Sequence, residues 1–250
     1  MVDLSHPWPF GLNRRTWPAF AAGLVLALVL LGFFDHFLSA TAHDQSTDVI
    51  NLFAEITRWG ESDWLLYPSF ALLVLFALLG RLLPDRVLRL AFLELVSLCG
   101  LIFVGVGLPS LVANLVKRLV GRGRPELFDS VGPLAFHPLA NAYVYESFPS
   151  GHTTTAFAAA MVLGFLAPRY FGLGLLYAVA IGLSRLVVGA HYPTDVLAGA
   201  VLGTLGAYAV RNYFAFRRWG FERLPDGRIV ARPPSAARRL MRRRQGRAAR

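Results

Sequence analysis

Long apolar stretches recur along this chain and are separated by short polar segments. Six of them approach the ~20 residues that a helix needs to cross a bilayer. They lie at residues 16–38, 64–83, 88–116, 152–168, 170–188 and 193–214. A helix satisfies its own backbone hydrogen bonds in lipid. The pattern therefore predicts an all-α polytopic membrane protein, with six transmembrane helices forming one bundle in a single domain, residues 1–214.

The composition agrees with this class. Hydrophobic residues make up 55% of the chain and charged residues 16%, whereas a soluble domain carries about 25% charged residues. The first stretch also admits a signal-peptide interpretation, because Arg14 and Arg15 precede it and Ala40-Thr41-Ala42 resembles a cleavage site. Its apolar core is longer than the ~7–15 residues of a signal peptide, so we expect a retained span.

The placement of the arginines predicts an orientation. They lie before the first span, in and around the connection between the second and third spans, and after the last span. By the positive-inside rule, these ends and both termini are cytoplasmic. We expect the basic tail, residues 215–250, to be disordered and to associate with anionic lipid headgroups, at about 1 kcal/mol per base. Nucleic-acid binding is not expected, because no reading surface accompanies this charge.

One connection breaks the charge rule. The segment between the third and fourth spans is extracytoplasmic by count, yet it holds Lys117, Arg118, Arg122 and Arg124. Lys117 is also the only lysine among the 25 basic residues of the chain. An anionic ligand is the simplest reason for a basic cluster on this side.

Three polar fragments stand out against the apolar background. They are Lys117 with Arg124-Pro125, then Pro149-Ser150-Gly151-His152, then Ser184-Arg185 with His191 and Asp195. With six spans, each fragment falls at the end or the start of a span on the same side of the membrane. The topology therefore predicts that all three fragments meet at one membrane face.

These residue types fit a phosphoryl group. Ser150 is a natural N-cap, and the free N–H groups of a helix start attract an anion. Gly151 allows the backbone to approach a ligand closely. The side chains expected to surround the phosphate oxygens are basic, namely Lys117, Arg124 and Arg185. Two histidines and one aspartate amid such cations make a poor metal site, so we expect neither a metal nor another cofactor.

The two histidines of the fragments suit different roles. His191 is the candidate nucleophile, because a neutral imidazole attacks phosphorus and Asp195 can hold its other ring nitrogen in the required tautomer. His152 is the candidate general acid for the leaving oxygen. A single histidine at a helix start is more often a cap or an interface residue, which is our interpretation of the histidines outside the fragments, His6, His36, His43 and His137.

The same residues resemble the signature of the type-2 phosphatidic acid phosphatase superfamily. Lys117 stands six residues before Arg124-Pro125, Pro149 to His152 forms the second element, and the third runs from Ser184-Arg185 through His191 to Asp195. The resemblance implies metal-independent hydrolysis of a phosphate ester through a phosphohistidine at His191. It also implies that Asp195 orients this histidine, that His152 is the acid, and that the three basic residues, Ser150 and Gly151 hold the phosphate.

The resemblance to the membrane members of this superfamily implies that the substrate is a lipid phosphate or a polyprenyl pyrophosphate. It also implies that the substrate is cut at the outer face of a bacterial inner membrane. Four candidates remain open: phosphatidylglycerophosphate, phosphatidic acid, undecaprenyl pyrophosphate and a lipid A phosphate. A lipid phosphotransferase, or a non-catalytic lipid-phosphate binder or transporter, is the alternative function.

The sequence also leads to expectations for one further segment and two acidic residues. Residues 45–63 are expected to form either an interfacial helix beside the lipid entrance or a packed connecting helix. Asp35 is expected at the membrane interface, at the outer end of the first span. Glu94 lies inside the third span, where it is either paired with Arg89 or close to the cytoplasmic face.

Overall fold

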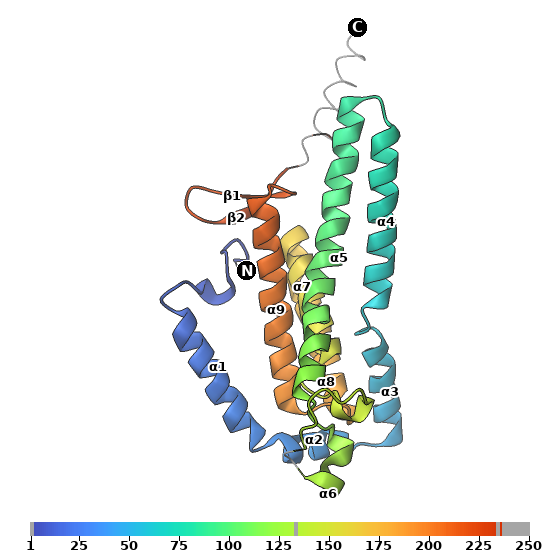
Figure 1. Cartoon of the computed structure of the whole chain (residues 1–250), viewed down its shortest axis with the longest axis vertical. Helices are drawn as coiled ribbons and strands as arrows, with labels where there is room; N and C mark the ends of the chain where they lie inside the picture. Colours follow the sequence, from blue (N-terminus) through green and yellow to red (C-terminus); the bar gives the residue numbers. More distant parts are fainter. Residues whose placement is uncertain (1–2, 133–134, 234–235, 237–250) are drawn as a thin grey trace.

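The computed structural model describes residues 3–132, 135–233 and 236. Within these residues the fold is almost entirely helical (Figure 1). The helices are α1 (Trp17–Gly32), α2 (Asp35–His43), α3 (Thr47–Arg58), α4 (Asp63–Leu82), α5 (Arg86–Val120), α6 (Phe128–Val131), α7 (Gly151–Leu166), α8 (Phe171–Val187) and α9 (Pro193–Phe216). Two short strands follow, β1 (Phe221–Arg223) and β2 (Ile229–Ala231), which pair in antiparallel fashion. The predicted all-α membrane class is confirmed.

Within the described residues, fewer helices than the six predicted are long and apolar enough to cross a bilayer. Four segments of the described chain are long and apolar enough to span a bilayer: Thr47–Leu82, Arg86–Val120, Pro168–Val187 and Pro193–Phe216. Helices α1 and α2 meet at an angle of 61° and make a fifth candidate if they are read as one span. Helix α7 has 16 residues, or about 24 Å at ~1.5 Å per residue, which is short of a ~30 Å hydrocarbon core.

Helix α7 lies at the centre of the bundle and packs against α5, α8 and α9. Its alanines and threonines let neighbouring backbones approach closely, as small residues do in membrane interfaces. A Cβ atom placed on Gly203 of α9 would lie 2.3 Å from the Thr154 carbonyl oxygen, and one on Gly199 would lie 2.6 Å from that of Ser150. Backbone contact between α7 and α9 therefore fixes how these two helices sit against each other.

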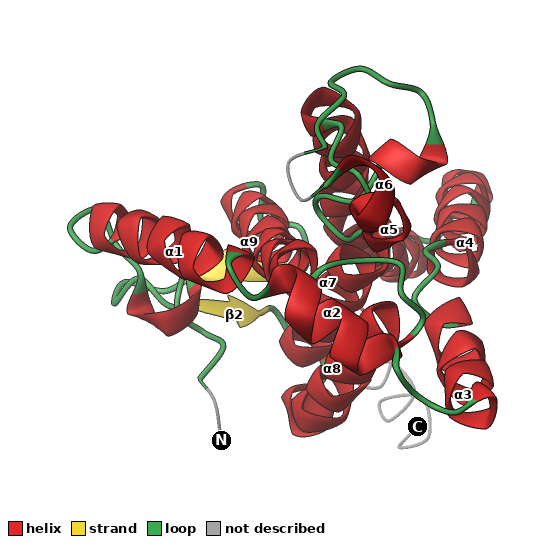
Figure 2. Cartoon of the chain, turned by 90° about the horizontal axis from the view of Figure 1, so that it is seen from below, coloured by secondary structure: helices red, strands yellow, loops and turns green. Residues whose placement is uncertain are grey.

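The shorter elements gather at one end of the bundle. Helices α2, α3 and α6 lie there in Figure 1, and the view from below in Figure 2 shows α2 crossing that end. Helix α5 ends at this end because Gly121 adopts a left-handed conformation, with φ of 62°. A side chain at Gly121 would collide with the His137 carbonyl. This turn sends the basic connection back across the bundle end.

The opposite end carries the start of the basic tail, where part of the prediction was wrong. Residues 217–233 are ordered here, because β1 and β2 form a hairpin and the Ile229 N–H donates to the Ser5 carbonyl, at 2.7 Å. Arg211 of α9 is buried and donates to the carbonyls of Leu4 and His6. The tail residues 234–235 and 237–250 lie outside the described residues.

Glu94 does not take the partner suggested from the sequence. Its carboxylate accepts a hydrogen bond from the Ala236 N–H, at 3.2 Å. Arg89 instead donates to the Leu83 carbonyl, at 3.3 Å.

The α7–α9 contact yields a test of the packing. Gly203→Ala should lower the free energy of unfolding by about 1–3 kcal/mol, because the new methyl group overlaps the backbone of α7. Gly172→Ala in α8 is the matched control, since a Cβ there meets nothing within 4 Å. Thermal unfolding of both variants in detergent measures the effect. Equal unfolding temperatures for the two variants would contradict this account of the interface.

Candidate active site

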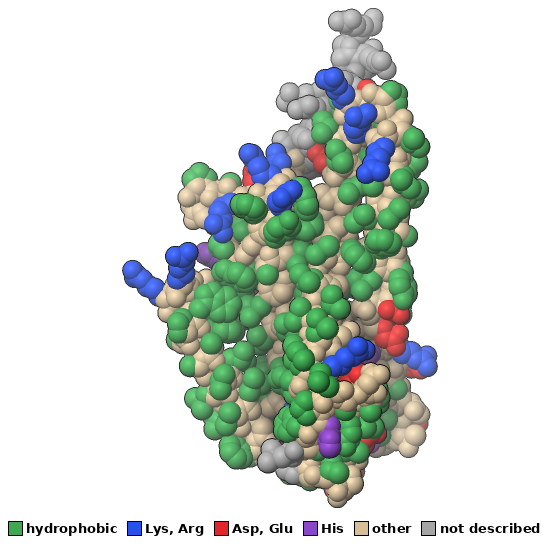
Figure 3. Space-filling view, in the orientation of Figure 1, with side chains coloured by type: hydrophobic (Ala, Val, Ile, Leu, Met, Phe, Trp, Pro, Cys, Tyr) green, Lys and Arg blue, Asp and Glu red, His purple; other side chains and the backbone are tan. Residues whose placement is uncertain are grey.

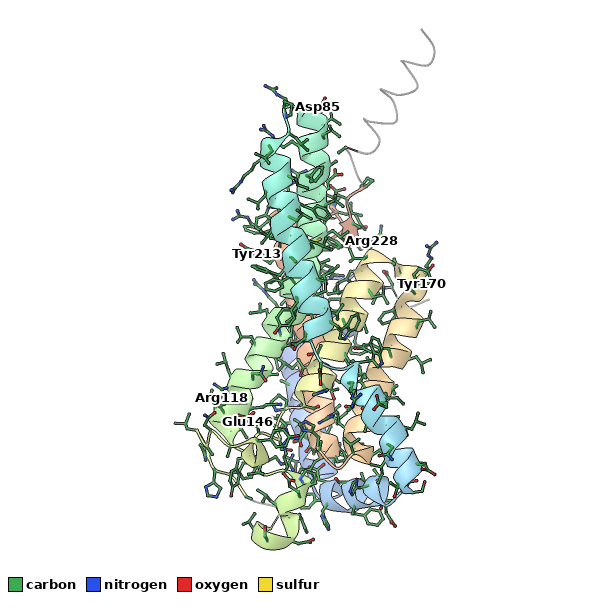
Figure 4. The ribbon with its side chains drawn as sticks, turned by 90° about the vertical axis from the view of Figure 1, so that its right-hand side faces the viewer. Asp85, Arg118, Glu146, Tyr170, Tyr213 and Arg228 are labelled. Atoms are coloured by element: carbon green, nitrogen blue, oxygen red, sulfur yellow. The ribbon has the colours of Figure 1, made fainter. Side chains whose placement is uncertain are left out.

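The three polar fragments meet at the bundle end where α5 ends and α7 and α9 begin. Their eight residues are Lys117, Arg124, Ser150, Gly151, His152, Arg185, His191 and Asp195. In Figure 4, Arg118 and Glu146 lie at this end, whereas Asp85, Tyr170 and Arg228 lie toward the other. The Arg118 Nε atom lies 3.9 Å from Glu146 Oε1. The helix order thus brings the fragments to one face, as expected from the sequence.

The start of α7 is joined directly to the start of α9. The Ser150 N–H donates to the Asp195 carbonyl, at 2.9 Å. The Ser150 hydroxyl caps α7: it accepts from the Thr153 hydroxyl at 2.9 Å, while the Thr153 N–H is 3.5 Å away. The first N–H groups of α7 have no partner within the helix, so they are available to an anion.

Lys117 reaches the start of α7 from the last turn of α5. Its side chain is buried, and Nζ lies 3.2 Å from the position that a Cβ on Gly151 would occupy. Glycine at 151 therefore leaves the ammonium group room beside the helix start. A larger residue would push this cation away from the N–H groups that it joins in attracting an anion.

Arg124 is held mainly by backbone. It donates to three carbonyls, those of Tyr143 at 2.9 Å, Ala190 at 3.0 Å and Glu146 at 3.4 Å. Its guanidinium carbon also lies 3.6 Å from the centre of the Tyr143 ring. Burial lowers the pKa of Arg124. Three of the five N–H donors of this guanidinium thus bind the connection before α7 and the connection between α8 and α9. The other two remain for a ligand.

Arg185 comes from the last turn of α8. Its Nη1 donates to the Thr57 hydroxyl at 2.6 Å, and its buried Nε has no hydrogen-bond partner in the described part of the chain. Thr57 belongs to α3, which packs against α8. Through this contact α3 helps to orient a cation of the site, and its packing against α8 is compatible with both expectations for residues 45–63.

His191 lies in the turn between α8 and α9 and is only 1% exposed. Its backbone N–H donates to the Arg185 carbonyl, at 3.2 Å. Its Nδ1 lies 3.6 Å from Asp195 Oδ2, slightly beyond hydrogen-bond distance, and catalytic contacts of this kind often tighten only when substrate binds. Burial is the main cause that lowers the pKa of His191 to about 4, so the imidazole is neutral near pH 7.

His152 begins α7 beside the same cations. Arg185, His191 and Lys117 are close enough to interact with it electrostatically. The turn between α3 and α4 covers its ring, because a Cβ on Gly60 would lie 3.0 Å from His152 Cδ2. The two imidazoles and the cations thus belong to one cluster.

Asp195 has partners that the sequence fragments did not reveal. Its fully buried carboxylate accepts from Arg122 Nη1 and from the Ser147 hydroxyl, both at 2.6 Å, and from the Tyr192 N–H at 2.8 Å. The Asp195 and Asp35 charges outweigh the desolvation of Arg122 and raise the pKa of that guanidinium. Arg122 carried a signal in the sequence, because it belongs to the basic cluster on the side expected to be extracytoplasmic. Ser147 carried none.

Asp35 corrects an expectation. It was expected at the membrane interface, yet it is 3% exposed and pairs with Arg122, with Nη2 and Oδ2 2.8 Å apart. A 61° bend between α1 and α2 turns the chain at Asp35 across the bundle end. A sequence pattern of apolar runs does not encode such a bend.

The cluster gathers three cations and two histidines at the start of α7, with a carboxylate beside His191. Among the described residues, no group of three or more His, Cys, Asp or Glu side chains is placed to hold a metal ion. A cavity of about 480 Å³ lies at the opposite end, lined by residues such as Ser5, Phe165 and Arg211. None of the eight fragment residues lines that cavity.

The comparisons with known proteins cover the part of the chain that holds this cluster. The sequence model of the PAP2 superfamily matches residues 96–219. A lipid A 1-phosphatase of Rhizobium johnstonii is 35% identical over 179 residues, which cover 71% of this chain and 72% of that protein. The chain belongs to the PAP2 superfamily.

Other PAP2 relatives show where the similarity concentrates. A lipid A 1-phosphatase of Rhizobium etli is also 35% identical, over 71% of this chain and 76% of its own length. A decaprenylphosphoryl-5-phosphoribose phosphatase of Mycobacterium tuberculosis is 40% identical, but over only 38% of this chain and 50% of its own length. The predicted resemblance is confirmed, and with it the assignment of this PAP2 chain to the membrane phosphatases, which hydrolyse phosphoric esters.

The burial of His191 leads to a test by titration. Since its pKa is lowered to about 4, below the ordinary ~6.5, the imidazole should stay neutral down to about pH 5 and gain its proton only below that. An NMR titration of ring-labelled histidine in detergent, with His191→Gln to assign the signal, measures this midpoint. A midpoint above pH 6 for His191 would contradict the buried environment described here.

Proposed function

We propose that this PAP2 protein hydrolyses a lipid phosphate without a metal, at the extracytoplasmic face, through a phosphohistidine at His191. The observation that carries the proposal is the convergence of the buried His191, the half-buried His152 and three cations at the start of α7. In phosphoryl transfer the protein contributes mainly positioning and stabilisation of charge on the equatorial oxygens. Lys117, Arg185, the remaining donors of Arg124 and the α7 N–H groups supply both.

The proposed reaction has two steps. His191 Nε2 attacks phosphorus, since Nδ1 faces Asp195, and the bond from phosphorus to the lipid oxygen breaks while His152 gives that oxygen a proton. Water then attacks the phosphohistidine, His152 takes a proton from the water, and the N–P bond breaks to release orthophosphate. Asp195 stabilises the positive charge that His191 carries between the two steps.

The proposed topology has six crossings, made by α1, α4, α5, α7, α8 and α9, in a bacterial inner membrane. Charge supports the orientation. Basic side chains gather where α4 joins α5 and around the hairpin, with hydrophobic side chains over the middle of the molecule (Figure 3). By the positive-inside rule that end is cytoplasmic, which puts the histidines on the other side. The basic tail then faces anionic headgroups at the cytoplasmic surface.

Lipid A 1-phosphate is the substrate that we favour among the four candidates. The two Rhizobium relatives are described as lipid A 1-phosphatases, and their similarity extends over 71% of this chain, well beyond the three fragments. The similarity to the phosphatase for decaprenylphosphoryl-5-phosphoribose covers 38% of the chain, which is little more than the fragments themselves. If this chain and a relative share the surface through which the lipid enters, their similarity should extend beyond the fragments, as it does for the two Rhizobium proteins.

The roles of the two histidines can be separated with leaving groups. His191→Ala should abolish phosphate release from every substrate. His152→Ala should slow a lipid phosphate by about 10²–10⁴-fold, but should slow p-nitrophenyl phosphate far less, because p-nitrophenolate needs little protonation. Phosphate release by both variants on both substrates is the measurement. Equal losses on the two substrates would overturn the assignment of His152 as the acid.

A phosphate-release panel tests the substrate. Purified protein in detergent is given lipid A, phosphatidylglycerophosphate, phosphatidic acid or undecaprenyl pyrophosphate, with His191→Ala as the blank. We expect the highest kcat/KM on lipid A, with loss of the 1-phosphate. A higher value on another lipid would replace lipid A as the substrate. Transfer to an added acceptor lipid would indicate a phosphotransferase, and binding without release would indicate a non-catalytic binder.

A further inference from the structure

Arg122 bridges two buried carboxylates that come from distant helices. Its Nη1 lies 2.6 Å from Asp195 Oδ1 and its Nη2 lies 2.8 Å from Asp35 Oδ2. The Arg122 side chain is 14% exposed, that of Asp195 is 0% exposed and that of Asp35 is 5% exposed. A buried ion pair costs desolvation free energy unless its geometry is good and the remaining groups are satisfied. The two outer nitrogens of Arg122 meet that condition, whereas its buried Nε has no hydrogen-bond partner among the described residues.

Thr194 closes the cluster. Its N–H donates to Asp35 Oδ1 at 3.0 Å, its hydroxyl donates to Asp35 Oδ2, and Arg122 Nη1 reaches that hydroxyl at 2.7 Å. The start of α2, the turn after α5 and the start of α9 are therefore joined through one guanidinium. Both outer nitrogens of Arg122 are occupied, and its plane lies over the Tyr192 ring, with 4.4 Å to the centroid.

The contacts of Arg122 determine which Asp195 oxygen faces the nucleophile. Arg122 takes Oδ1, which leaves Oδ2 for the Ser147 hydroxyl, the Tyr192 N–H and, at 3.6 Å, His191 Nδ1. A carboxylate that could rotate would present either oxygen to the imidazole. The Arg122 contact on Oδ1 opposes that rotation together with the Ser147 and Tyr192 contacts on Oδ2.

We propose that Arg122 is a positioning residue for the reaction of His191, that it acts through Asp195, and that Asp35 holds Arg122 in place. This inference rests on the proposed function. Nη1 and Nη2 of Arg122 contact Asp35, Thr194 and Asp195, so we assign Arg122 a place behind Asp195 and not a role in holding the phosphate. Its contribution should therefore appear in the turnover step and not in substrate binding.

The variants are Arg122→Gln, Arg122→Lys and Asp35→Asn, with Arg58→Gln as the matched control. Arg58 is 71% exposed in its side chain and pairs only with Glu55 in the described residues, at 2.9 Å. Each variant is assayed for kcat and KM on the lipid that the wild type cleaves best. A displacement of about 1 Å at a catalytic group costs about 10²-fold in rate, which sets the scale of the effect.

We expect Arg122→Gln to lose about 10²-fold in kcat with KM almost unchanged. Arg122→Lys should recover part of this loss, because an ammonium group can hold one of the two carboxylates. Asp35→Asn should lose less than Arg122→Gln, and the double variant should be no worse than Arg122→Gln alone. Arg58→Gln should match the wild type.

Three outcomes would overturn the inference. They are an unchanged kcat in Arg122→Gln, a loss confined to KM, and additive losses in the double variant. Thermal unfolding accompanies every assay, and if Arg122→Gln does not fold, Arg122→Lys and Asp35→Asn decide: wild-type kcat in both overturns the inference. An inactive wild type would instead count against the proposed function.

Discussion

The hydrogen bond from the Ser150 N–H to the Asp195 carbonyl is the contact on which the site depends. It joins the start of α7 to the start of α9, at 2.9 Å, and the glycines at 199 and 203 keep the two helices this close along their length. Because the capped start of α7 and the turn that carries His191 are both fixed by it, the first N–H groups of α7 and the His191 imidazole keep one relative position. Backbone groups make this contact, so it does not depend on the rotamers of long side chains.

The electrostatics of the site are divided between two layers. Lys117, Arg124 and Arg185 surround the helix start, whereas Arg122 lies behind Asp195 between two carboxylates. Under the proposed function, the first layer attracts a phosphate. The second neutralises the carboxylates, which keeps Asp195 from cancelling the attraction that the first layer provides. A chain with 25 basic and 15 acidic residues thus uses its few buried acids where a histidine needs them.

The sequence predicted the parts of this structure that depend on composition or spacing. Apolar runs of the required length indicated a helical membrane protein, and the three fragments indicated which residues would meet. The pattern did not reveal contacts that depend on tertiary geometry. Asp35 reads as an ordinary residue after an apolar run, and only the bend between α1 and α2 brings it to Arg122. Ser147 has no feature in the sequence that separates it from other serines, and the hairpin in the tail depends on pairing with Ser5.

The shortness of α7 has a consequence for how a lipid would be processed. With 16 residues, α7 is shorter than the apolar layer of a bilayer. When its C-terminal end lies near one membrane surface, its first turn therefore lies at or below the headgroups of the opposite leaflet. A phosphate bound there stays at the depth that it already occupies in the leaflet. Under the proposed orientation, the acyl chains can remain among their neighbours throughout the reaction, and no extraction of the lipid into water is needed.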